Sequence, residues 1–360
     1  MTQQPQDELD LRNQRPSAGE ARRFTTGEAL FLAPLPVPTG HLPMDLGGSF
    51  IEVNDTYLDV GQSNTNKAFQ AQLMIWGTMS VGLSLFLILP LLAATARATG
   101  PYQEDFWGVF WEFFSFSVSV SWWLFLPIVA LSIYPVLSTT FKKARIRPLR
   151  FNRQRREVCY FPEGSDEPII QPWEELVAWV SVSTGFTGEG VMSTYTFGMA
   201  IDNPKTDMTH FLTHGVFTPA HGISKWEAIR TYMEKGPEHC PGKAPYEGRH
   251  TFDIERADLH EAYREGYASA IGVAWWYLCR VVTWWRFPYW VAEWDHGYAM
   301  KTMPASIAQW SQPLPVEQWA KPSQALKEQT ARLEKAYANG QNFTTYFNSQ
   351  LGAEPAERCS

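Results

Sequence analysis

The sequence contains few cysteines, and none of them form a close pair. Cys159, Cys240, Cys279 and Cys359 are far apart in a chain of 360 residues, and no CxxC motif occurs. A zinc knuckle or a disulfide framework needs cysteines in regular groups, so the spacing indicates neither. We expect reduced thiols in a cytosolic compartment.

Basic charge is also scarce over the chain as a whole. There are 30 Lys and Arg residues against 37 Asp and Glu residues, which gives a formal net charge of −7. A surface that tracks phosphates usually needs a basic domain, so we expect no nucleic-acid partner. The polar first residues lack the apolar core of a signal peptide, so an internal apolar segment must direct any membrane insertion.

Charge is absent from two long stretches, residues 68–96 and 113–141. A helix rises about 1.5 Å per residue, so either stretch can cross a hydrocarbon core of roughly 30 Å. Two buried helices of a soluble core are the alternative, but such helices seldom stay free of charge on every side for this length. The pattern predicts a two-helix transmembrane hairpin over residues 67–141.

A dense basic cluster follows the second apolar stretch, whereas the loop between the two stretches is acidic overall. Basic residues near the end of a span stay in the cytoplasm, so both termini are expected inside, at a bacterial inner membrane. The cluster can also attract anionic lipid headgroups, at about 1 kcal/mol per basic residue. The residues assigned to topology and headgroup contact are Lys142, Lys143, Arg145, Arg147 and Arg150.

The segments on either side of the hairpin differ in character. Residues 1–66 form a polar and proline-rich segment, of which residues 1–30 are expected to be mobile. The passage APLPVPTGHLP that follows favours extended structure, as a linker or a docking motif for a partner. Residues 142–236 alternate apolar and polar side chains over several short stretches and predict antiparallel strands. A helix should follow, with Ser224 and Glu227 as its capping box and Gly236 as its end.

Residues 237–360 predict a helical region rich in tryptophan. One helix is expected over residues 253–287, ending before Pro288, and another over residues 323–340. The first is too short between Gly266 and Arg280 for a third span. A helix lying in the plane of the headgroups and a helix packed in a protein core are equally compatible with it. Its candidate interfacial residues are Trp275, Trp276, Arg280, Trp284, Trp285 and Arg286.

Catalytic motifs are weak. His210, His214 and His221 are close in sequence but lack the glutamate of an HExxH site, and ordinary histidines explain them better. The glycines of GFTGEG, residues 185–190, are followed by no Lys-Ser or Lys-Thr, so this is a turn between strands and not a phosphate loop. We expect no catalytic residues, no cofactor and no metal.

Several of these segments resemble known families. The succession RFNRQRREV, PWEELVAWV, a meander of strands and a terminal helix is similar to the pleckstrin-homology-like domains of bacterial membrane proteins. Residues 67–320 also resemble a family of unknown function in two-span proteins, some of them associated with type VI secretion effector loci. The resemblance implies an accessory or immunity role and offers no catalytic residues.

Three functions therefore remain open from the sequence. The leading one is a non-enzymatic binding protein anchored in the inner membrane, with a protein partner, as an immunity or accessory factor for a type VI secretion toxin. The second is a subunit of an oligomeric channel or transporter. The third is a metal-dependent lipid-modifying enzyme that uses the three histidines.

Overall fold

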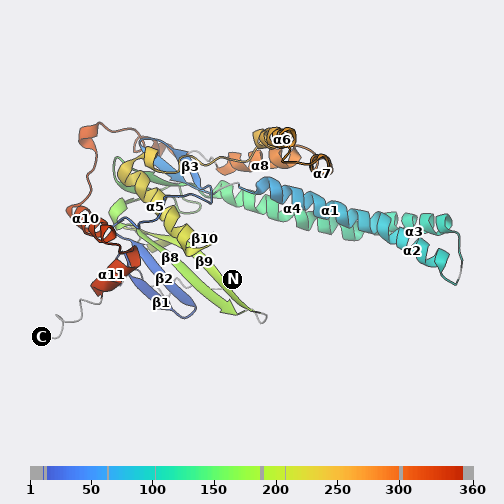
Figure 1. Ribbon diagram of the computed structural model, residues 1–360, viewed down its shortest axis with the longest axis horizontal. Helices are drawn as coiled ribbons and strands as arrows, with labels where there is room; N and C mark the ends of the chain where they lie inside the picture. Colours follow the sequence, from blue (N-terminus) through green and yellow to red (C-terminus); the bar gives the residue numbers. More distant parts are fainter. Residues whose placement is uncertain are drawn as a thin grey trace. The chain divides into compact units, whose positions relative to one another are not determined.

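The computed structural model describes residues 11, 14–62, 65–101, 103–186, 190–206, 208–299 and 303–351. The chain forms two compact units (Figure 1). The sheet unit comprises Met1–Ser63, Ile146–Pro245 and Lys301–Ser360, and the helical unit comprises Asn64–Arg145 and Tyr246–Met300. The segments expected from the sequence were consecutive, but the chain leaves the sheet unit twice and returns to it twice.

The first sheet of the sheet unit has five antiparallel strands in the order β1-β2-β8-β9-β10. Its alternating β9 was predicted, and Phe197, Met199 and Ile201 on one side of that strand are buried in the core. The five strands are β1 (Ala21–Phe24), β2 (Gly27–Ala33), β8 (Val177–Phe186), β9 (Val191–Asn203) and β10 (Met208–Val216).

The second sheet is also antiparallel, in the order β3-β4-β5-β6-β7. Its strands are β3 (Phe50–Val53), β4 (Tyr57–Val60), β5 (Leu149–Asn152), β6 (Glu157–Tyr160) and β7 (Ile169–Pro172). Val60 at the end of β4 is paired with Leu149 at the start of β5. In the sequence, the apolar hairpin is therefore inserted between two strands that are neighbours in one sheet.

Residues 1–30 were expected to be mobile, but the described part of residues 1–66 contributes β1 to β4, and the proline-rich passage, expected to be a linker or docking motif, connects β2 to β3. Phe31, Leu32, Phe50 and Leu58 from these strands are fully buried. Runs of four to seven residues are too short to show a clear period, and only pairing with distant strands makes them ordered. This segment is a structural part of both sheets.

One helix, α5 (Pro219–Lys235), packs against the core, where Trp226 is stacked on Trp173 with ring centroids 5.0 Å apart. The helix begins earlier than expected, because the side chain of Thr218 accepts a hydrogen bond from the His221 amide and caps it. Ser224, the expected cap, is buried inside the helix. The predicted end at Gly236, with φ of 106°, is confirmed.

The remaining pieces of the sheet unit are short helices and single turns. The predicted C-terminal helix is confirmed as α10 (Gln324–Ala338), which begins after its capping Ser323 and ends before Gly340. The others are η3 (Trp173–Glu175), η4 (Pro237–His239), α9 (Ala305–Ala308), η5 (Val316–Gln318) and α11 (Phe343–Leu351).

The helical unit contains the hairpin as two long arms. The first arm joins α1 (Lys67–Leu83), the π-helical turn η2 (Ser84–Ile88) and α2 (Leu89–Thr99), and the second joins α3 (Phe106–Val120) and α4 (Trp122–Arg145). Pro90 has no amide hydrogen and its ring crowds the preceding turn, which accounts for the widened π turn just before it. Lys67–Thr99 and Trp122–Arg145 are each long and apolar enough to cross a membrane.

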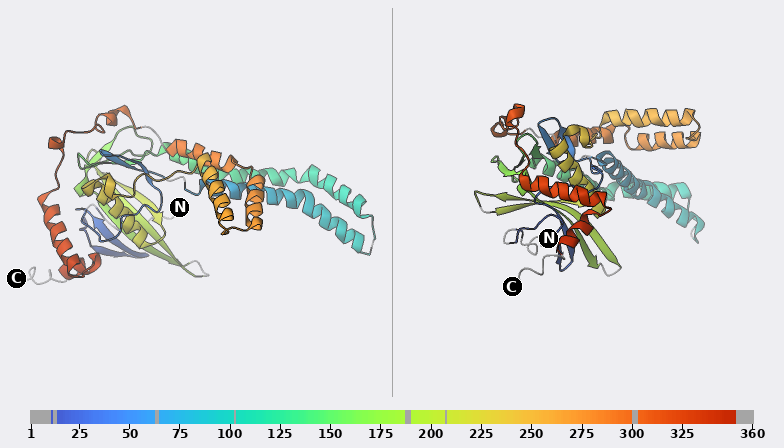
Figure 2. Two further views of the ribbon diagram at one scale, coloured as in Figure 1. Left: turned by 45° about the horizontal axis from the view of Figure 1, so that its top comes forward. Right: turned by 60° about the vertical axis from the view of Figure 1, so that its left-hand side comes forward.

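Three further helices belong to the helical unit: α6 (Arg249–Arg264), α7 (Ala270–Val282) and α8 (Phe287–Ala299). Helices α6 and α7 lie side by side (Figure 2). A single helix over 253–287 was expected. Gly266 instead adopts a φ of 81° and interrupts it, and Pro288 lies in the first turn of α8, where its missing amide hydrogen costs no helical bond.

Candidate membrane-binding surface

The two long helices present apolar side chains outwards along most of their length. Only 11% of the most apolar stretch of either helix is buried, whereas a core helix of a soluble protein would be mostly buried. A continuous apolar surface of this kind needs an apolar environment. Its most exposed members include Leu73, Leu83, Leu92, Trp123, Leu131 and Tyr134.

Helix α7 carries a second apolar surface, which we call the α7 stripe. It consists of Ile271, Trp275, Leu278 and Val281, which are 83, 61, 50 and 61% exposed. Their spacing of three and four residues places them on one side of the helix. With 13 residues, α7 is about 20 Å long and too short to cross a bilayer, so the stripe suits a helix that lies along a membrane surface.

The four tryptophans among the six predicted interfacial residues divide into two groups. Trp275 and Trp284 are each 61% exposed. Trp276 and Trp285 pack on the buried ring of Phe252, at centroid distances of 5.6 and 5.0 Å. The first two can contact lipid directly, while the second two join α7 and the following turn to α6.

The two predicted arginines also attach this region to α6. Arg280 donates a hydrogen bond to Glu255 at 2.7 Å and lies over the ring of Trp276. Arg286 pairs with Asp253, and its side chain remains 45% exposed. Both cations are therefore tied to carboxylates, and Arg286 is the better placed of the two to meet a headgroup.

The predicted basic cluster divides in a similar way. Lys142 and Arg145 are exposed at the end of α4. Arg147 pairs with Asp166, and its guanidinium lies over Phe161. The structure therefore offers Lys142 and Arg145 for contact with lipid headgroups, while Arg147 serves the packing of the sheet unit.

Arg150, the last member of that cluster, is buried in the sheet unit. Its guanidinium donates two hydrogen bonds to Asp59, at 2.7 and 2.6 Å, and lies 3.7 Å from the centre of the Tyr57 ring. The planar fork matches the carboxylate and the ring face, which a lysine could not do. Its role in the fold is to fasten β5 to β4.

A buried charge cluster, missed by the sequence analysis, joins α1, α4 and α8. Asp295 is fully buried, and its carboxylate lies 3.1 Å from the ammonium of Lys67 and 2.6 Å from that of Lys143. Thr140 donates a third hydrogen bond at 2.5 Å. The ammonium of Lys67 also donates hydrogen bonds to the carbonyl of Val136 and the hydroxyl of Thr139, in addition to its contact with Asp295.

The environment of Asp295 keeps its carboxyl ionised. Burial alone would raise the pKa of Asp295, but the hydrogen bonds from Lys143 and Thr140 and the two lysine charges outweigh it, so the pKa lies below its ordinary value. Two cations share one anion in a site closed to water. We call Asp295, Lys67 and Lys143 the Asp295 cluster. The cluster fastens α8 to both arms of the hairpin.

The three histidines are placed in different surroundings. His210 and His214 lie on β10, where His210 contacts the ring of Tyr160, and His221 lies in the first turn of α5. Among the residues that the structure describes, no group of three His, Cys, Asp or Glu side chains is placed to hold a metal ion. Burial lowers the pKa of His214 to about 4, with a smaller contribution from the charge of Lys225.

Comparison with known proteins gives one match. The sequence profile of a family of unknown function, DUF6708, matches residues 124–322, which is more than half of the chain. The matched range begins in α4 and includes β5 to β10, α5 to α8 and η5. No curated protein and no solved structure gives a significant match.

Proposed function

Because the chain belongs to the DUF6708 family, whose function is unknown, we propose a function from its own residues: a non-enzymatic binding protein anchored in the bacterial inner membrane. The observation that carries the proposal is the exposed apolar surface of the two long helices. In water, such a surface would drive aggregation, whereas a bilayer core accommodates it.

The connectivity supports a hairpin with both ends on one side of the membrane. The chain departs after β4 and returns at β5, and these strands are paired. The exposed cations Lys142 and Arg145 lie in the last turn of the second arm, which favours the cytoplasm for the sheet unit and both termini. The α7 stripe would then lie in the headgroup layer as a further attachment.

The strand order supports a pleckstrin-homology-like arrangement in the sheet unit. The resemblance noted in the sequence implies a meander of strands closed by a helix. Strands β4 to β7 are neighbours in one sheet, β8 to β10 are neighbours in the other, and α5 follows them and packs in the shared core. In this proposal β1, β2 and β3 extend the two sheets, and the membrane hairpin is an insertion.

The edge strand β10 supports a binding role. It has nine residues, contains no proline, lysine or arginine, and among the described residues its backbone pairs only with β9. A long unprotected edge is a template for an added strand. We propose that an extended segment of a partner protein pairs with β10.

The other three sheet edges are protected. The four-residue β1 carries two arginines, and β7 follows Pro168 and ends at Pro172. The edge of β3 is covered at Phe50, whose carbonyl accepts a hydrogen bond from the Ala244 amide. Short strands, charge, proline and a covering segment are the usual protections of an edge. The contrast singles out β10 as the binding edge.

The resemblance to proteins of type VI secretion effector loci gives the proposal its specific form. We propose that the partner is a secreted toxin or a protein that acts with it, so that this chain is an immunity or accessory factor. An inward-facing domain attached to the membrane would meet such a toxin at its point of entry.

The experiment is site-specific photocrosslinking in living cells. A photoreactive amino acid at Thr213 on β10 should capture a protein partner, whereas the same residue at Thr196 on the inner strand β9 should capture none. Mass spectrometry then identifies the partner. Capture of lipid alone, with no protein at Thr213, would contradict the binding role.

A further inference from the structure

An apolar groove lies within the helical unit, between α1, α4 and α8. Its volume is about 380 Å³. Helix α8 forms one wall and the two arms of the hairpin form the others. Its lining includes Thr78 of α1, Val129 and Ile133 of α4, and Trp290, Val291 and Trp294 of α8.

The groove offers almost nothing to a polar ligand. Thr78 is its one residue with a polar side chain apart from the tryptophans, and the Thr78 hydroxyl is hydrogen-bonded to Ser132 at 3.1 Å. A bound water needs two to four polar partners, and a polar ligand needs donors or acceptors that match it. The chemistry of the walls therefore selects an aliphatic occupant.

The length of the hairpin places the groove at the edge of a bilayer core. The first arm has 33 residues and is about 50 Å long, whereas the hydrocarbon core is roughly 30 Å thick. The part beyond the groove, residues 80–99, spans about 30 Å by itself. The groove then lies where acyl chains meet headgroups, and Trp284 and Trp290, 61 and 47% exposed, suit that layer.

We propose that this groove binds one acyl chain of a membrane phospholipid, between α8 and the hairpin. The inference rests on the proposed insertion of the hairpin, because the open side of the groove is continuous with the surface that would face lipid. The Asp295 cluster fixes α8 against both arms and so holds the groove open to a fixed width. A bound phospholipid would then be a structural component of the folded helical unit.

The test uses a phospholipid that carries a photoreactive diazirine in one acyl chain. The full-length protein is reconstituted in vesicles containing this lipid and irradiated, and its adducts are mapped by mass spectrometry. Adducts are expected on the groove side of α8, at Trp290, Val291 and Trp294, as well as on the outer surface of the hairpin. Helix α8 is the informative site, because it is not one of the two spanning helices.

Variants that fill the groove provide the control for position. Ile133→Trp places a large ring in the groove, and Leu131→Trp places the same ring on the same helix outside it, at a residue that is 71% exposed. Adducts on α8 should fall to background in Ile133→Trp and persist in Leu131→Trp. Val129→Phe, a smaller filling variant, should also reduce them, and gel filtration checks that each variant stays folded.

Each outcome decides a different claim. Equal α8 adducts in wild type and both filling variants, or adducts on the outer surface of the hairpin with none on α8, would overturn the acyl-chain site and leave membrane insertion standing. A protein that stays out of the vesicles and gains no adducts would overturn the proposed anchoring itself.

Discussion

Replacing Asp295 by asparagine should destabilise the helical unit more than other single changes on α8. The substitution keeps the size of the side chain and removes its charge. The side chains of Lys67 and Lys143 are only 4 and 10% exposed. In the variant, their two positive charges would therefore lie in a closed site with no anion between them. The fastening of α8 to both arms of the hairpin should weaken.

The magnitude follows from the burial of all three groups. Removing one partner of a buried ion pair costs about 3–5 kcal/mol, because the remaining charge stays desolvated without compensation. For a domain of this size each kcal/mol lowers the melting temperature by about 3 °C, so a fall of roughly 10 °C is expected. Circular dichroism of the detergent-solubilised protein during heating measures it.

The control is Glu293→Gln on the same helix. Glu293 pairs with Arg249 at 2.7 Å, but that pair is exposed and screened by solvent, so its loss should change the melting temperature little. A triple variant, with methionine at both lysines and leucine at Asp295, should recover much of the loss, since an apolar replacement of a buried charge group is often neutral. An Asp295→Asn protein that melts together with the Glu293→Gln protein would refute the reasoning.

Three further predictions concern separate parts of the chain. Burial raises the pKa of Cys159 to about 12, so iodoacetamide at pH 8 should modify Cys279 in the folded protein and leave Cys159 unmodified until denaturant is added. Because burial lowers the pKa of His214 to about 4, the unfolded chain takes up a proton near pH 6.5 and the folded chain does not. The free energy of unfolding should therefore fall as the pH drops from 7 to 4, by up to about 1.4 kcal/mol per pH unit, and His214→Asn should flatten the fall seen in urea titrations. If the α7 stripe lies in the headgroup layer, a cysteine at Leu278 should react with an impermeant maleimide more slowly than one at Asp258 in inside-out vesicles; equal rates would contradict it.

Several elements of both units follow from the sequence because their signals are local. Two runs without charge are enough to locate the hairpin, and the ends of α5 and α10 coincide with Gly236 and Asn339-Gly340, where the left-handed conformation favours glycine. The alternation of β9 also identifies a strand without reference to the rest of the chain. Each of these features depends on neighbours in sequence.

The rest depends on contacts between distant residues. Lys67 and Asp295 meet only because α8 returns to the hairpin after the whole strand region, and no spacing in the sequence indicates it. Lys143 and Arg150 look like surface cations in a basic cluster, but buried carboxylates far along the chain pair with them. In the sequence the cluster is one run of basic residues, whereas in the structure its members pair with different carboxylates.

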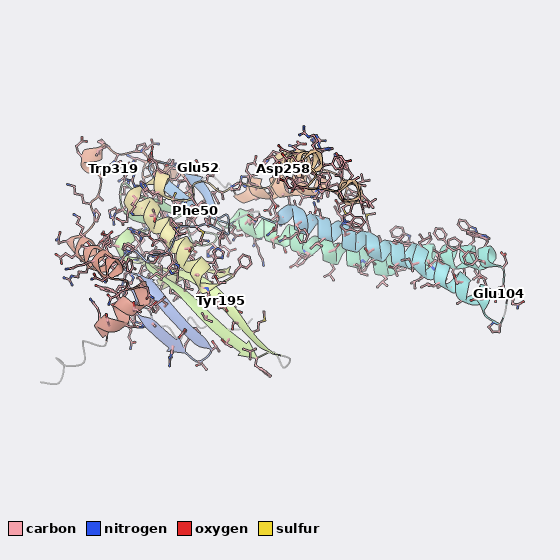
Figure 3. The ribbon with its side chains drawn as sticks, viewed as in Figure 1. Phe50, Glu52, Glu104, Tyr195, Asp258 and Trp319 are labelled. Atoms are coloured by element: carbon pink, nitrogen blue, oxygen red, sulfur yellow. The ribbon has the colours of Figure 1, made fainter. Side chains whose placement is uncertain are left out.

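The central claim is that the hairpin spans the membrane with the sheet unit inside, and cysteine accessibility tests it most directly. Glu104, in the loop between the arms, and Glu52, on β3 (Figure 3), have side chains that are 38 and 36% exposed, so cysteines there should be similarly reactive in a solubilised protein. In intact spheroplasts, an impermeant maleimide should modify Glu104→Cys and leave Glu52→Cys unmodified until the cells are lysed. Modification of Glu52→Cys in intact spheroplasts, or of neither residue before lysis, would contradict the account.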